Sequence, residues 1–227
     1  MKITLISDTH TKHHLINEFL TEGDLIIHAG DVMNSGYVDD NIVDFCKWFD
    51  KLDYNTKIFI AGNHDKMFEQ LPQTSLEIVN SYKWINYLQD DYIIVDGVKI
   101  YGSPWQPFFH NWAFNLPRNE TELKSKWDKI PTDTDILVTH GPAWGKVDTV
   151  KNRNEHLGCE LLAERIKEIK PKIHVCGHIH SGNGYMFDGH THSFNASVLN
   201  EKYNFEYKPF IFEWDKETNE IEFLQTP

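Results

Sequence analysis

Short apolar runs alternate along the chain with segments in which apolar residues recur every three or four positions. The apolar runs predict buried β-strands at residues 3–7, 25–29, 57–61, 135–139 and 172–176. The periodic segments predict amphipathic helices at residues 12–22, 38–52, 120–130 and 159–169. Strands that alternate with helices in this way are typical of an α/β layered fold.

Antiparallel strands are predicted in two further regions. Residues 92–95 and 98–101 flank Asp96-Gly97, a pair that favours a tight hairpin turn because both central residues need a positive φ. Residues 207–214 and 221–224 form a second predicted pair. The pattern contains no repeat, low-complexity tract or linker, so we expect one domain over residues 1–227.

Five of the predicted strands end in residues that can bind metal ions. These residues are Asp8 and His10, Asp31, Asn63 and His64, His140, and His178 and His180. In α/β sheets, ligands bind beyond the carboxyl ends of the strands, where loops from neighbouring strands meet. Carboxylate and imidazole ligands suit Mn, Fe, Zn and Ni rather than Ca or Mg alone. The sequence therefore predicts a metal site assembled from five loops.

The order of these motifs resembles the calcineurin-like metallophosphoesterase superfamily. The matching motifs are Asp8-Thr9-His10, Gly30-Asp31, Gly62-Asn63-His64-Asp65, His140 and Gly177-His178-Ile179-His180. Residues 102–107, 111–118 and 135–142 narrow the resemblance to the metallophosphoesterase-domain-containing group. The resemblance implies an α/β fold with four layers, the α/β/β/α sandwich of the metallophosphoesterase type, and hydrolysis of phosphoesters.

The same resemblance assigns a role to each matching residue. It implies two divalent metal ions, with Mn²⁺ as the first choice and Fe, Zn or Ni as alternatives. The first ion is expected at Asp8, His10, Asp31 and His180, and the second at Asp31, Asn63, His140 and His178. Asp31 would bridge the ions, which lie about 3.5–4 Å apart in two-metal hydrolases. A hydroxide activated by both ions would attack phosphorus, with His64 as the general acid and Asp65 orienting its loop.

Charge and composition restrict the partners. The chain has 22 Lys and Arg against 34 Asp and Glu, a formal net charge of −12, which disfavours non-specific binding to nucleic acids. An anionic substrate remains compatible because bound metals reverse the local field. No apolar run could span a bilayer and the first residues do not resemble a secretory signal, so we expect a cytoplasmic protein without membrane contact. The three cysteines are expected to be buried free thiols.

Candidate substrate contacts outside the metal motifs rest on residue type alone and not on an ordered motif. Trp105, Arg118 and Arg153 are candidate substrate contacts. Either arginine could hold a phosphate or a base through paired hydrogen bonds, and surface ion pairs are an equal alternative. Trp105 belongs to an aromatic cluster for which core packing is the first interpretation and a substrate wall is the alternative. The members of this cluster are Trp105, Phe108, Phe109, Trp112 and Phe114.

Four other histidines are interpreted without a role in the site. His28 and His174 lie within apolar strands, where a buried and hydrogen-bonded ring is favoured over a metal ligand. His13 and His14 begin a predicted helix, and we expect both to be solvated.

The predicted reaction is hydrolysis of phosphoesters, and phosphodiesters such as cyclic or other small nucleotides are favoured over monoesters. A nuclease or a phosphoprotein phosphatase on the same scaffold is an alternative, although the chain lacks the basic stripe of a nuclease. A catalytically silent nucleotide-binding interaction protein is another alternative. Such a protein would normally have lost a ligand or His64, and this chain retains both. The expected partner is a small phosphoester or nucleotide, and the sequence does not determine the oligomeric state.

Overall fold

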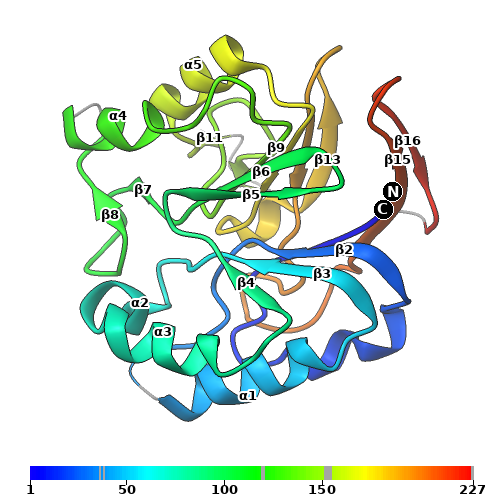
Figure 1. The fold of residues 1–227 in the computed structure, drawn as a ribbon. Coiled ribbons are helices and arrows are strands. Elements are labelled where there is room, and N and C mark those ends of the chain that lie inside the picture. Colours follow the sequence, from blue (N-terminus) through cyan, green and yellow to red (C-terminus); the bar gives the residue numbers. More distant parts are fainter. Residues whose placement is uncertain (36, 38, 119–120, 151–154, 226–227) are drawn as a thin grey trace.

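The computed structural model describes residues 1–35, 37, 39–118, 121–150 and 155–225, and these form two six-stranded sheets (Figure 1). The first sheet contains, in spatial order, β16 (Glu220–Phe223), β15 (Phe210–Asp215), β1 (Lys2–Ile6), β2 (Gly23–His28), β3 (Tyr54–Phe59) and β4 (Ile85–Tyr87). The second sheet contains, in spatial order, β13 (Gly184–Phe187), β14 (His192–Asn195), β12 (Ile173–Cys176), β9 (Ile136–Thr139), β6 (Val98–Ser103) and β5 (Asp91–Val95). Parallel strands occupy the centre of each sheet; antiparallel strands lie at both edges of the second sheet and at the β16 edge of the first, whose other edge strand, β4, is parallel to β3.

The two sheets pack face to face over a shared apolar core. Alternate residues of a strand point to opposite faces. Ile3 and Leu5 of β1 therefore lie in this core with Val138 of β9 and Val175 of β12, and all four are fully buried. Ile6 points to the other face of β1 and is also buried, in a separate cluster. Burial on both faces explains why these strands appear in the sequence as continuous apolar runs.

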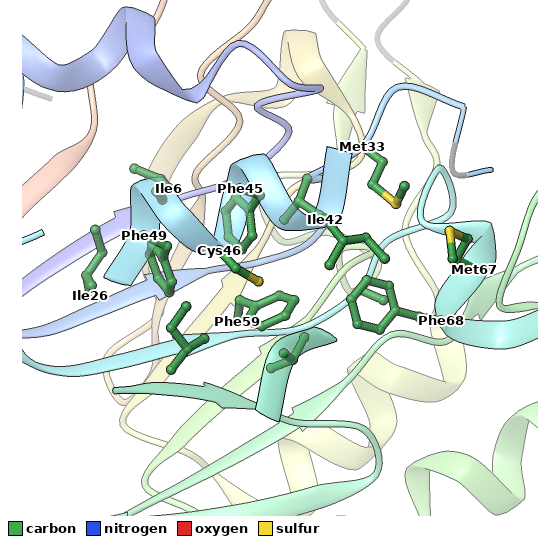
Figure 2. Close-up of a cluster of buried hydrophobic side chains, with 14 of the residues drawn as sticks. Ile6, Ile26, Met33, Ile42, Phe45, Cys46, Phe49, Phe59, Met67 and Phe68 are labelled. Atoms are coloured by element: carbon green, nitrogen blue, oxygen red, sulfur yellow. The ribbon is translucent and has the colours of Figure 1, made fainter. Parts of the chain in front are cut away.

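Helices cover the outer face of each sheet. On the first sheet, α1 (Asp39–Asp50) places Phe45 with its ring centroid 5.2 Å from that of Phe59 on β3 (Figure 2). On the second sheet, Leu162 of α5 (Glu160–Ile169) packs in a buried cluster with Leu137 of β9. Figure 1 shows α1, α2 and α3 on one outer side and α4 and α5 on the other. The predicted α/β/β/α arrangement is confirmed.

Most of the predicted elements form. Each of the five apolar runs is a strand, and both antiparallel pairs are present as β5–β6 and β15–β16. Helix α1 begins at Asp39, and α4 comprises Thr121–Trp127; residues 38 and 120 of these predictions lie outside the described residues. The sequence pattern did not predict the short helices α2 (Lys66–Gln70) and α3 (Pro72–Asn80) or the three-residue strand β4.

The predicted helix at residues 12–22 is wrong in type and length. The segment is a 3₁₀ helix, η1, over His13–Phe19, and Leu20 after it is extended. Its buried residues are His13 and Ile16. A spacing of three matches the repeat of a 3₁₀ helix, in which residues i and i+3 lie above one another. The expected solvation of His13 is also wrong, since it is only 3% exposed, whereas His14 is exposed as predicted.

None of the helices that the structure describes combines the length and apolar character needed to cross a bilayer.

Candidate metal centre

The loops after β1, β2, β3, β9 and β12 meet at one edge of the paired sheets and bring the predicted metal ligands together. Several ligands have backbone conformations that side chains rarely adopt, with φ of 55° at Asp8, 57° at Asp31 and 67° at His178. Glycine is required beside them. A Cβ on Gly62 would lie 2.2 Å from Asp31 Oδ1, and one on Gly177 would lie 2.1 Å from Asp8 Oδ2. The glycines thus allow the backbone to pass directly behind the two carboxylates.

One half of the cluster consists of Asp8, His10 and His180. The Nε2 atom of His180 lies 3.4 Å from Asp8 Oδ1 and 3.2 Å from Nε2 of His10. The same nitrogen of His10 lies 3.6 Å from Asp31 Oδ2. These ligand atoms are close enough to share one metal ion.

The other half consists of Asn63, His140 and His178, again beside Asp31. The Nε2 atom of His140 lies 3.4 Å from Asp31 Oδ2 and 3.0 Å from Asn63 Oδ1. The Nδ1 atom of His178 lies 2.7 Å from the same oxygen of Asn63. Oxygen Oδ2 of Asp31 therefore faces both halves, as a bridging ligand would.

Backbone carbonyls orient three of the imidazole rings. The Nδ1–H groups of His10, His140 and His180 donate to the carbonyls of Met33, Ala29 and Asn200 at 3.1, 2.9 and 2.9 Å. Because a carbonyl can only accept, the proton stays on Nδ1 and each Nε2 can bind a cation. The donor set is thus suited to divalent metal ions.

Electrostatics keep the carboxylates ionised. Although burial opposes it, His140 holds the pKa of Asp31 below its usual range, and Asp31 in turn raises the pKa of His140 to about 9. Burial lowers the pKa of His10 to about 4 and that of His178 to about 3. Two neutral rings and ionised carboxylates face a common centre, and a bound cation would displace the proton of His140.

His64 lies at the border of this cluster. Its backbone N–H donates to Asp31 Oδ1 at 2.8 Å, and its Nδ1–H donates to the carbonyl of Asn34. Trp112 stacks on its ring, with centroids 4.0 Å apart. The ring is also close enough to His10 and Asp31 to share a cation with them. His64 therefore lies within reach of both the cation position and the cavity.

Asp65 joins two of the ligand loops. Its carboxylate is fully buried and accepts backbone N–H groups from Gly62, Val32 and Met33 at 2.7, 3.2 and 2.8 Å. Burial, and then the charge of Asp31, raise the pKa of Asp65 to about 7. Asp65 ties the loop after β3 to the loop after β2, which is the place in the site that the sequence motif predicted for it.

A cavity of about 460 Å³ opens beside the cluster. Its lining includes Asp31, His64 and His178 together with Phe109 and Tyr203. Phe109 is 46% exposed and meets the ring of His178 edge-on at 5.3 Å. A larger groove of about 1290 Å³ lies elsewhere on the surface and contains none of the predicted ligands.

The aromatic cluster divides between the core and the site. Phe114 is fully buried in the core, whereas Phe108 and Phe109 line the cavity. Trp105 does not line it: its indole N–H donates to Asp90 and its ring packs against Phe114. Core packing therefore describes Trp105 better than a place in the cavity wall, which its neighbours Phe108 and Phe109 occupy.

The two candidate arginines differ in outcome. Arg118 lines the cavity, but its guanidinium is held by Glu160 at 2.6 Å and by the carbonyls of Leu157 and Gly158. The ion-pair alternative thus applies to Arg118. Arg153 lies outside the described residues. His28 and His174 are buried and bonded to the hydroxyls of Thr9 and Thr139, as predicted.

Sequence reasoning missed three residues at the site. Gln106 and Tyr203 line the cavity, and the hydroxyl of Ser197 donates to Asp8 Oδ2 at 2.7 Å. None of them belongs to a strand-end motif. Gln106 stands beside the predicted aromatic cluster, while nothing in the pattern around Tyr203 or Ser197 indicates a contact with residues so far away in the chain.

Comparisons with known proteins agree with this geometry. The profile of the calcineurin-like phosphoesterase family matches residues 1–182. Human metallophosphoesterase domain-containing protein 1 is 38% identical over 93% of this chain and 70% of its own length. A UPF0046 protein of Caenorhabditis elegans is 35% identical over 94% of this chain and 60% of its own length.

Two solved structures share the fold at low sequence identity. The protein TT1561 of Thermus thermophilus has a TM-score of 0.63 at 15% identity, over 98% of this chain and 97% of its own. The phosphopantetheinyl hydrolase of Mycobacterium tuberculosis has a TM-score of 0.59 at 14% identity, over 89% and 90% of the two chains. With the ordered motifs and the converging ligands, these matches show that the chain belongs to the calcineurin-like metallophosphoesterase family, whose members use a dinuclear metal centre.

Proposed function

We propose that this protein hydrolyses small phosphodiesters with two divalent metal ions, preferably Mn²⁺, in the strand-end cluster. The observation that carries the proposal is the position of Asp31 Oδ2, which lies 3.6 Å from Nε2 of His10 and 3.4 Å from Nε2 of His140. One carboxylate can thus serve both halves of the ligand set. Asp8, His10 and His180 would complete one half, and Asn63, His140 and His178 the other.

Two divalent ions would carry more positive charge than the carboxylates of the cluster can neutralise. Two ions bring four positive charges, and Asp8 and Asp31 supply two negative ones. The surplus attracts a phosphate despite the negative net charge of the chain. When bound, such ions lower the pKa of a coordinated water and polarise phosphoryl oxygens.

In this proposal His64 delivers the proton that the leaving group needs. The carbonyl of Asn34 accepts the Nδ1–H of His64, and the Trp112 ring restrains the imidazole at a centroid distance of 4.0 Å. The remaining ring nitrogen, Nε2, is then available to the substrate, and in the doubly protonated imidazolium it carries the proton that passes to the leaving oxygen. A proton donor fixed in this way lowers the cost of expelling a poor leaving group such as an alkoxide.

Diesters are favoured by the small number of positive side chains around the cavity. Among the described residues that line it, Arg118 is the sole lysine or arginine, and Glu160 already neutralises it. A monoester dianion would need more compensation than a diester monoanion. Phe108, Phe109 and Tyr203 provide flat apolar surfaces on which a nucleobase or another planar group can rest.

The test compares bis(p-nitrophenyl) phosphate with p-nitrophenyl phosphate after chelation and after addition of Mn²⁺, Fe²⁺, Zn²⁺ or Ni²⁺. We expect hydrolysis only with added metal, a higher kcat/KM for the diester and the highest rate with Mn²⁺. A higher kcat/KM for the monoester would refute the diester proposal but not the phosphoesterase. Absence of hydrolysis with every metal would refute catalysis and support a binding role.

A further inference from the structure

A closed set of hydrogen bonds lies behind the metal ligands and joins Asp8 to the loop that carries His178. The Ser197 hydroxyl lies 2.7 Å from Asp8 Oδ2 and 2.9 Å from Asn195 Oδ1. It has one hydrogen to donate, and the shorter distance and the negative charge of Asp8 favour donation to the carboxylate. The backbone N–H of Ser197 donates to Asn195 Oδ1 at 3.2 Å, which holds the two side chains together.

The other end of the Asn195 carboxamide fixes the ligand loop. Its Nδ2 group lies within hydrogen-bonding distance of three carbonyls, those of Ile179 at 2.9 Å, Val147 at 3.2 Å and Gly177 at 3.4 Å, and Ile179 and Gly177 stand on either side of His178. The backbone N–H of His178 in turn donates to Asp8 at 3.0 Å, which closes the set. Rotation of the Asp8 carboxylate or displacement of the loop would therefore break at least one of these bonds.

Asn195 and Ser197 lie where the two sheets meet. Asn195 ends β14 in the second sheet, and Ser197 forms a bridge to Ser7, the residue after β1 in the first sheet. Asn195, Ser197 and Asp8 have no exposed surface. Hydrogen bonds between such buried groups are not weakened by competing water. The pair thus links the two sheets directly beneath the ligands.

We propose that Ser197 and Asn195 are positioning residues that set the affinity for metal, Ser197 at the site formed by Asp8, His10 and His180, and Asn195 at both sites through the loop that carries His178 and His180. The inference rests on the metal centre of the proposed function. Neither residue reaches the reacting atoms. Each acts through Asp8 or the His178 loop by holding it in the orientation that a metal ion requires. Loss of such a partner of a ligand typically weakens metal binding about 10–100-fold.

The main experiment titrates chelated protein with Mn²⁺ by isothermal calorimetry, using Ser197→Ala, Ser197→Thr and Ser193→Ala. Ser193 is a matched control, because it lies on β14, is 1% exposed and has a hydroxyl without a partner among the described residues. We expect Ser197→Ala to raise the Kd of one of two sites by about 10–100-fold. Ser197→Thr, which keeps the hydroxyl, and Ser193→Ala should remain within about twofold of the parent.

A second readout separates positioning from general loosening of the fold. In metal-free protein Ser197→Ala should melt somewhat below Ser193→Ala, because it alone loses a buried bond between the sheets, and kcat at saturating Mn²⁺ should stay near that of the parent. Parent affinity in Ser197→Ala would overturn the inference, as would equal weakening of Mn²⁺ binding in Ser193→Ala. If the parent itself binds no Mn²⁺, the proposed function fails instead.

Asn195→Ala tests the other half of the set. It removes the donors to Gly177 and Ile179 and the acceptor for the Ser197 backbone. We expect both Mn²⁺ sites to weaken, since the loop carries His178 as well as His180. Weakening smaller than that in Ser197→Ala would contradict a role for Asn195 in fixing the loop.

Discussion

Replacement of His64 with alanine distinguishes a proton donor from a metal ligand at the border of the cluster. The backbone N–H of residue 64, which donates to Asp31 Oδ1 at 2.8 Å, is present whatever the side chain. Asp31 therefore keeps its orientation in His64→Ala. We expect both metal ions to remain bound and the turnover rate to fall.

The expected magnitude follows from what the side chain does. A positioned general acid contributes roughly 10²–10⁴-fold to rate, equivalent to about 3–5 kcal/mol of barrier. Loss of the contact with Trp112 and of the bond to the Asn34 carbonyl costs stability of about 1–3 kcal/mol, which a folded domain tolerates. The loss should appear in kcat rather than in KM, because charge on the leaving oxygen develops only in the transition state.

The assay measures metal content together with hydrolysis of two diesters, one that releases p-nitrophenolate and one that releases a nucleoside alkoxide. His64→Ala should lose more activity on the alkoxide, which needs the proton more. His64→Gln is the matched control, because it retains a donor and much of the volume but cannot release a proton at neutral pH. Loss of a metal in His64→Ala would make His64 a ligand. Parent rates on both substrates with both metals bound would show that His64 is not the acid.

Three other predictions concern charge, metal and pH. Asp31→Asn should abolish nearly all activity and the binding of one ion, and full activity with two ions bound would contradict a bridging Asp31. Chelation should lower the melting temperature by about 10 °C if the free metal exceeds its Kd about 1,000-fold, as checked by calorimetry with and without metal. Burial lowers the pKa of His13 to about 4 in the folded protein, whereas the ring has its ordinary pKa of about 6.5 in the unfolded chain. Between these pH values the unfolded chain binds a proton at His13 that the folded protein does not, so the stability of the fold decreases as the pH drops from about 6.5 to about 4. In metal-free protein, urea unfolding at pH 7 and pH 5 should show that His13→Gln reduces this loss by about 2 kcal/mol, and an unchanged pH dependence would contradict a buried neutral ring.

The parts of the fold that could be predicted from sequence are those with a strong local pattern. The strands before Asp8, Asp31 and His140 are buried on both faces, so their continuous apolar runs are unambiguous. Because parallel strands end at one edge of a sheet, the predicted topology already brought their terminal residues together. The 3₁₀ segment containing His13 was misread, because the apolar residues at positions 15, 16, 19 and 20 have the spacing of an α-helix, whereas only Ile16 among them is buried.

The parts that could not be predicted depend on contacts between distant residues. The bond from Ser197 to Asp8 spans 189 positions, and the bond from Asn195 to Gly177 joins the end of β14 to the loop after β12. A serine or an asparagine near a strand end has many possible partners, and only the packing of one sheet on the other selects among them. For Trp105 the sequence left core packing and substrate contact as alternatives, because its hydrogen-bond partner Asp90 is placed by the β5–β6 pairing and not by the aromatic sequence around it.

Backbone hydrogen bonds of the fold hold the ligand loops in conformations that side chains rarely adopt. Asp8, His10, Asp31 and His178 have φ values of 55°, 43°, 57° and 67°, a region that costs a non-glycine residue roughly 1–2 kcal/mol. Backbone bonds offset this cost: Asp8 donates to the carbonyl of Gly30 at 3.0 Å, and His10 donates to that of Asp31 at 3.0 Å. These bonds link the two loops independently of any ion. Metal binding then need not supply the energy that bends the loops, so a larger share of its free energy can appear as affinity.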